Sequence, residues 1–175
     1  MPSEGHDKAV SGESPALEPT ESDPRIYVDI ADTRIMGMRA TPLTLTNRGG
    51  DVAHHIQVQA IGRASFEEVD TISRNQDRQI LPEVEGGNIF GKNNLFPVIE
   101  EMNPEWQPDN YKSGITVIAT VTFESFLHRK FCVDVEIIYL SLKDKLQESA
   151  ESRGKSFASG EPIVKTRHLG FKRLA

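Results

Sequence analysis

The chain has 175 residues, a net charge of −6 and a hydrophobic share of 37%, which is enough for one domain of ordinary size. No apolar run reaches the ~18 residues that span a bilayer, so we expect no transmembrane segment, and the acidic balance argues against nucleic-acid binding. A single cysteine excludes an internal disulfide, and without a recognisable signal peptide the default expectation is a cytoplasmic protein.

Charge divides the chain into three parts. Residues 1–24 carry six acidic side chains and one basic one, net −5, with few large apolar residues. Such a segment cannot bury enough surface to offset its ordering entropy, so we expect it to be disordered. Residues 25–142 hold 16 acids and 11 bases and should form the folded domain. Residues 143–175 carry eight bases and four acids, and we expect a basic tail with a short helix over 141–152.

Alternation of apolar and polar residues dominates residues 25–142 and is typical of half-buried antiparallel strands. In the strand expected at 52–59 it places His54 on the inner face and His55 on the outer face. About seven short strands predict an all-β, immunoglobulin-like antiparallel β-sandwich with disordered tails, and a closed small barrel is the alternative. The expected strands are 26–30, 43–46, 52–59, 66–71, 76–81, 115–123 and 131–140.

A crossover of about thirty residues, 83–113, breaks this rhythm and is too long for a plain loop. We expect a short helix in it, capped by Asn93 or Asn94, with Pro97 in its first turn. The apolar side of that helix would consist of Leu95, Val98, Ile99 and Met102.

The same crossover contains the candidate partner-binding residues. Glu100 and Glu101 precede Trp106 and Tyr111, and aromatic side chains near carboxylates in a long loop can bind a partner. The alternative is that these aromatics cover the open end of the sandwich.

A glycine-rich stretch before the helix has the spacing of a phosphate-binding loop. Gly86, Gly91 and Lys92 match GxxxxGK, but Asn93 stands where Ser or Thr should hold Mg²⁺. The expected buried parallel strand before the loop is also missing from the pattern. We therefore favour a surface loop and keep nucleotide binding as the alternative.

Neither the histidines nor the cysteine predicts a catalytic or metal site. His54 and His55 point to opposite faces of a strand, so they cannot bind one metal ion without a bulge. Cys132 lies in a strand, where a lone cysteine is more often a packed residue than a nucleophile. We expect no enzyme activity, no metal and no cofactor.

One hairpin resembles a known family. A strand ending in Thr46-Asn47-Arg48-Gly49-Gly50-Asp51 leads into the alternating residues of 52–58. This segment is similar to the first hairpin of bacterial immunoglobulin-like modules of the CARDB type, and to uncharacterised bacterial proteins sharing the Thr-Asn-Arg-Gly-Gly-Asp segment. We expect its residues to tolerate positive φ and set a turn. The resemblance implies a non-catalytic spacer or binding unit, often envelope-associated, and it supplies no site residues.

The pattern as a whole predicts a non-catalytic binding or protein-interaction module. A protein partner would bind a sheet edge through main-chain hydrogen bonds, or would contact the crossover 83–113. The alternatives are a small nucleotide-binding protein using Gly86 to Lys92, and a structural domain of a larger assembly with the two tails as tethers.

Overall fold

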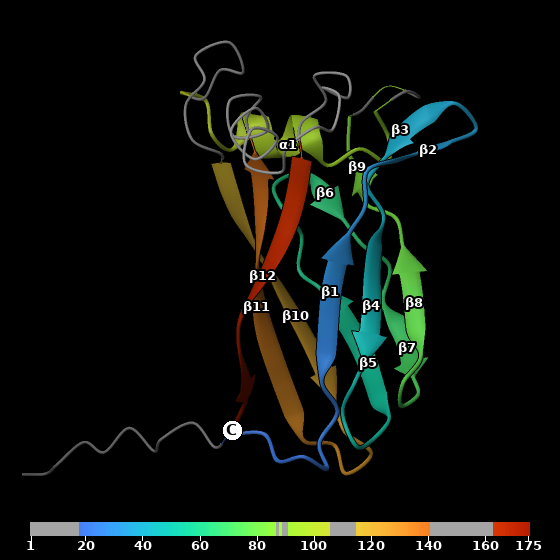
Figure 1. Ribbon diagram of the computed structural model, residues 1–175, viewed down its shortest axis with the longest axis vertical. Helices are drawn as coiled ribbons and strands as arrows, with labels where there is room; N and C mark the ends of the chain where they lie inside the picture. Colours follow the sequence, from blue (N-terminus) through green and yellow to red (C-terminus); the bar gives the residue numbers. More distant parts are fainter. Residues whose placement is uncertain (1–17, 87, 89–90, 106–114, 141–162) are drawn as a thin grey trace, which may run out of the picture.

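Two antiparallel β-sheets packed face to face make up the fold (Figure 1). The structure is a computed structural model that describes residues 18–86, 88, 91–105, 115–140 and 163–175. The smaller sheet has the order β1-β4-β8 and the larger one β12-β11-β10-β5-β7. This arrangement confirms the predicted all-β sandwich. The strands are β1 (Ile26–Ile30), β4 (Leu43–Asn47), β8 (Asp77–Ile80), β5 (Ala53–Val58), β7 (Val69–Ile72), β10 (Ile115–Glu124), β11 (Lys130–Leu140) and β12 (Ile163–Arg173).

Short elements cover one end of the sandwich (Figure 1). They are the hairpin of β2 (Thr33–Ile35) and β3 (Met38–Ala40), the pair of β6 (Ala64–Ser65) and β9 (Glu83–Val84), and the helix α1 (Phe96–Glu101). The helix lies within the predicted crossover and has Pro97 in its first turn. Phe96, Val98 and Ile99 are buried, whereas Met102 is 49% exposed, contrary to expectation. The N-cap is Leu95, which makes no side-chain cap hydrogen bond, so the expected cap at Asn93 or Asn94 was wrong. The side chain of Asn94, one position earlier, accepts a hydrogen bond from the Phe96 N–H at 3.1 Å.

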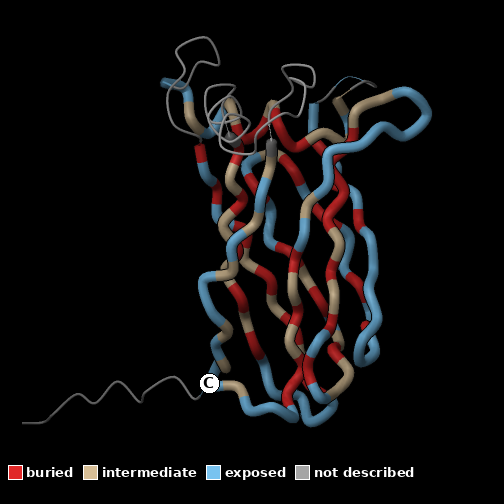
Figure 2. Tube along the Cα trace, in the orientation of Figure 1, coloured by how far each residue is buried: buried red, intermediate tan, exposed pale blue. Residues whose placement is uncertain are grey.

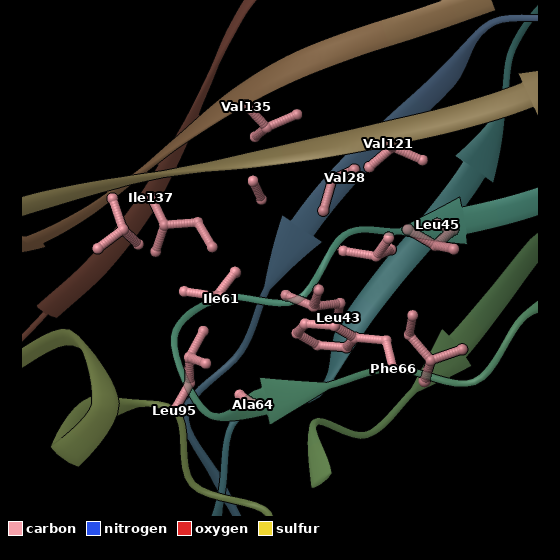
Figure 3. Close-up of a cluster of buried hydrophobic side chains, with 14 of the residues drawn as sticks. Val28, Leu43, Leu45, Ile61, Ala64, Phe66, Leu95, Val121, Val135 and Ile137 are labelled. Atoms are coloured by element: carbon pink, nitrogen blue, oxygen red, sulfur yellow. The ribbon is translucent and has the colours of Figure 1, made fainter. Parts of the chain in front are cut away.

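The hydrophobic core lies between the two sheets, and the alternation read from the sequence creates it. Along β10 every second residue, from Ile115 to Phe123, is buried, which Figure 2 shows as alternating colours. Val28 and Leu45 of the smaller sheet face Val121 and Val135 of the larger sheet (Figure 3). Each such side chain contributes about 1.5–3 kcal/mol when fully buried, so packing across this interface is what holds the sheets together.

A bulge in β5 overturns the predicted faces of that strand. His55 has a positive φ of 48°, and Thr122 pairs with Gln57 whereas Glu124 pairs with His54. One extra residue therefore lies on β5 between these two pairs. Ala53 and Ile56 are both buried and His54 is only half-buried, so the assignment of His54 to the inner face was wrong.

β12 corrects the expected domain boundary. Residues 163–173 were assigned to the basic tail, but they form an eleven-residue strand paired with β11. The register shifts between Val133 and Val135, opposite a segment in which Gly170 has a φ of 121°. Basic residues on the exposed face and this irregularity obscure the strand pattern in the sequence. The folded domain therefore extends past residue 142, and the helix expected over 141–152 lies outside the described residues.

His168 of β12 closes one side of the sandwich against β1, the neighbouring edge strand (Figure 1). The Val28 N–H donates a hydrogen bond to Nε2 of His168 at 2.9 Å. Tyr27 packs on His168 with 5.0 Å between ring centroids and on Phe171 with 5.2 Å. Because Nε2 accepts this hydrogen bond, the ring must be neutral with its proton on Nδ1.

We expect this contact to make stability depend on pH. Burial lowers the pKa of His168 below its ordinary 6.5; Asp29 opposes the shift and Arg48 reinforces it. The unfolded ring takes up a proton more readily than the folded ring. The free energy of unfolding should therefore be highest above pH 6.5 and fall as the pH drops through 6.5 toward the lower folded pKa.

Denaturant unfolding across this pH range measures the effect. In His168→Gln, which cannot titrate, stability should fall less steeply on acidification than in the unmodified chain. If the stability of the two proteins changed with pH in the same way, protonation of His168 would not control the contact between β12 and β1.

Asn47, the last residue of β4, is a fully buried polar hub. Its Oδ1 accepts hydrogen bonds from the N–H of Gly49 at 3.0 Å and of Arg25 at 3.2 Å. Its Nδ2 donates to the carbonyls of Asp51 at 2.7 Å and Ile72 at 2.9 Å. All four hydrogen bonds that its amide can make are formed, and they join the start of β1, the β4–β5 loop and the end of β7.

The two glycines after this hub serve close packing rather than positive φ. A Cβ on Gly49 would lie 2.2 Å from the carbonyl oxygen of Asp23, and one on Gly50 would lie 2.6 Å from that of Glu21. Neither glycine is among the described residues with positive φ, so the expected reason for them was wrong. Their missing side chains let the segment before β1 lie against the loop.

Replacing Asn47 with Ala should strongly destabilise the fold. It removes four hydrogen bonds and leaves the Gly49 N–H and Ile72 carbonyl without a side-chain partner in a buried setting. A buried polar group left unsatisfied costs about 1–3 kcal/mol, so we expect a loss of about 3 kcal/mol or more. Chemical denaturation measures this loss. Gln79→Ala, on an exposed position of β8, is the control and should change stability by less than about 0.5 kcal/mol.

Candidate functional site

A groove of about 380 Å³ runs between β7 and β8, the edge strands of the two sheets. β7 pairs only with β5 and β8 pairs only with β4, so each has one edge free of strand partners among the described residues. Figure 1 shows the two strands next to each other on one side of the sandwich. The groove is lined by Glu67, Glu68, Val69, Arg78, Gln79, Ile80, Leu81, Glu83, Lys92 and Asn93.

The lining combines an apolar floor with charged walls. Val69 and Ile80 are buried, whereas Leu81 is partly exposed. Nζ of Lys92 is 3.9 Å from Oε1 of Glu83, which also lines the groove. Three carboxylates and two cations face this space, so it can hold a segment that is both apolar and charged.

The segment around Lys92 is held in place by hydrogen bonds in which backbone groups take part. Nδ2 of Asn93 donates to the carbonyl of Pro82 at 2.9 Å, and the Thr41 N–H donates to the carbonyl of Asn93 at 3.0 Å. The Thr41 hydroxyl in turn accepts a hydrogen bond from the Leu95 N–H at 2.8 Å. This part of the groove is therefore built on the sandwich and not on a free loop.

The glycine-rich stretch lacks the surroundings of a phosphate-binding loop. β9, which precedes it, pairs antiparallel with β6, and α1 begins at Phe96 rather than directly after Lys92. Gly86 has a φ of 69°, and the Gly91 N–H donates to Oδ1 of Asn88 at 3.0 Å. Lys92 reaches the groove instead of a helix N-terminus.

Glu100 and Glu101 make contacts in different directions, so they do not form one cluster. The Tyr139 hydroxyl donates to Oε1 of Glu100 at 3.2 Å, and burial followed by the charge of Glu100 raises the pKa of Tyr139. Arg63 donates two hydrogen bonds to Glu101, at 2.8 and 2.7 Å. These bonds lower the pKa of Glu101. Trp106 and Tyr111 lie outside the described residues.

Three histidines come together at the end of the sandwich that lies opposite α1. The bulge in β5 lets His54 and His55 line one hollow of about 240 Å³ together with His128. His55 is 3.0 Å from a carboxylate oxygen of Glu68. Within the described part of the chain, no three metal-binding side chains are grouped so that they could hold a metal ion.

Sequence reasoning missed most of the groove. Glu67 and Glu68 precede β7, and Arg78 and Gln79 belong to β8. These residues meet only because the strands are the edges of different sheets. The one available signal was Lys92, which the glycine spacing singled out for another reason.

Comparisons with protein family models, with curated proteins and with solved structures found no match. The resemblance of the hairpin at residues 42–58 to CARDB-type modules therefore stays a prediction. In the portions of the chain that the structure describes, no helix has the length and apolar character needed to cross a membrane.

We expect Cys132 to react slowly with alkylating reagents. Burial raises the pKa of its thiol, and the charge of Asp134 adds to the effect while Lys172 opposes it. Since the thiolate is the reactive form, iodoacetamide should modify Cys132 more slowly than a cysteine placed at exposed Ser73 in a Cys132→Ala background. Equal rates at neutral pH would show that the thiol is available for nucleophilic chemistry.

Proposed function

We propose that this protein is a non-catalytic interaction module that binds an extended segment of a protein partner along β7 and β8. The observation that supports this proposal is the groove of about 380 Å³ between two edge strands with free edges. An extended segment can add to such an edge through main-chain hydrogen bonds, while pockets select its side chains.

The lining indicates the chemistry of the partner segment. The apolar surface of Ile80 and Leu81 suits one aliphatic or aromatic side chain. The carboxylate of Glu67 suits a basic residue of the segment, and the cations Arg78 and Lys92 suit an acidic one. We therefore expect a partner segment that combines an apolar residue with charges of both signs.

The other edge of the sandwich supports this choice of strands. β12 and β1 lie against each other and are joined by the His168 contact with the Val28 N–H. A partner strand that paired with β1 or β12 on this side would have to break the contact between His168 and the Val28 N–H. Among the described residues no strand pairing joins β7 to β8, which makes them the cheaper place for strand addition.

The test begins with selection of binding peptides from a random library against the full chain. The selected peptides are then titrated into isotope-labelled protein. We expect amide signals of residues 67–69 and 77–81 to shift, because these backbone groups border the groove. Arg78→Glu and Leu81→Ser should weaken peptide binding, whereas Arg34→Glu in the β2–β3 hairpin, which does not line the groove, should not.

Signal shifts confined to other surfaces, or full binding by the Leu81→Ser variant, would contradict the proposal. Trp106→Ala separates the groove from the crossover. If that substitution alone abolished binding while the signals of 77–81 stayed unchanged, the crossover and not the strand edges would be the binding surface.

A further inference from the structure

We propose that the tip of the β10–β11 hairpin, residues 125–129, docks on a membrane surface that contains anionic phospholipid. Phe126 is 71% exposed and Leu127 is 65% exposed. They are adjacent at the end of the sandwich that lies opposite α1, where the two strands meet (Figure 1). Large apolar side chains this exposed and this close together on a surface indicate an interaction site.

The hairpin holds these two side chains in a fixed position. The Ser125 N–H donates to the Arg129 carbonyl at 2.9 Å, and the His128 N–H donates to the Ser125 carbonyl at 3.0 Å. The buried Ser125 also accepts a hydrogen bond from the Arg129 N–H through its hydroxyl at 3.2 Å. His128 has a φ of 58°, as in three-residue hairpin loops that end in a left-handed residue. The exposed pair is therefore a built feature of the turn.

Cations lie directly behind this apolar tip. Arg129, Lys130 and Arg173 line a hollow of about 330 Å³ together with His128 and the partly exposed Leu174. The Leu174 N–H donates to the Lys130 carbonyl at 2.8 Å, which fixes the end of β12 beside the hairpin.

Two of the basic side chains in this hollow pair with a carboxylate of the described residues, and two do not. Arg129 is 3.9 Å from Asp23, and His128 is 3.6 Å from Glu124. Lys130 and Arg173 have no ion-pair partner among the described residues, so their charge is available to an anionic surface.

An anionic bilayer fits this arrangement better than a protein partner does. A stable protein interface buries about 800 Å² on each side, and two side chains at a hairpin tip are far too small for that. A bilayer needs only an apolar tip that enters the interface and nearby Lys or Arg residues that attract anionic headgroups. The hairpin tip supplies both features. Its apolar side chains lie at the end of the molecule, and the basic side chains lie behind them.

Co-sedimentation of the full chain with vesicles tests this inference. We expect binding to vesicles of phosphatidylcholine with phosphatidylserine, little binding to phosphatidylcholine alone, and weaker binding at high salt. The Phe126→Ser, Leu127→Ser double variant should bind about tenfold more weakly or worse, because it loses two apolar side chains. Lys130→Glu with Arg173→Glu should also reduce binding severalfold.

Met36→Ser is the matched control, since Met36 is 92% exposed in the hairpin at the opposite end of the sandwich. It should leave vesicle binding unchanged. The tip substitutions alter exposed side chains, and unchanged thermal unfolding would confirm that the variants fold. If the double variant does not fold, the single variant Leu127→Ser replaces it in the binding assay. No binding to anionic vesicles, or equal binding by the tip variant and the control, would overturn the proposal.

Discussion

The fold depends on the satisfied amide of Asn47. Four hydrogen bonds from one buried side chain join the entrance to β1, the loop between the sheets and the end of β7. The backbone of the same residue accepts from Asn75 and donates to Gln76, so the β7–β8 turn is tied to it as well. Because the apolar packing between the two sheets is non-directional, this hub fixes how their loops meet. The groove between β7 and β8 is one result.

The strands could be predicted from the sequence because one face of each is buried. Alternation in β10 and β11 translates directly into burial, and the sandwich follows from pairing such strands. The pattern failed where the backbone departs from a period of two. At His55 a bulge moves Ala53 to the core, and near Gly170 a register shift interrupts β12. A one-residue change of register reverses the faces of a strand, so no residue-by-residue count could have placed His54 correctly.

The surfaces proposed for binding were harder to predict because they are products of topology. Lys92 could be noticed by its spacing, but Glu67 and Arg78 become neighbours only when two sheets place their edges together. Phe126 and Leu127 are ordinary loop residues in the sequence, and their meaning comes from where the turn points and from Arg173, which is distant in the chain. The groove and the tip lie on different elements, so one molecule could hold a protein segment while it rests on a membrane.

The contact between His168 and the Val28 N–H joins residues 140 positions apart in the chain. Contacts between such distant residues form late, because a long loop must close before they gain any stability. During synthesis β1 would emerge first, and its outer edge would stay open until β12 had been made. An open strand edge of this kind invites pairing with other chains. Closure of this edge by β12 therefore protects the nascent domain from aggregation.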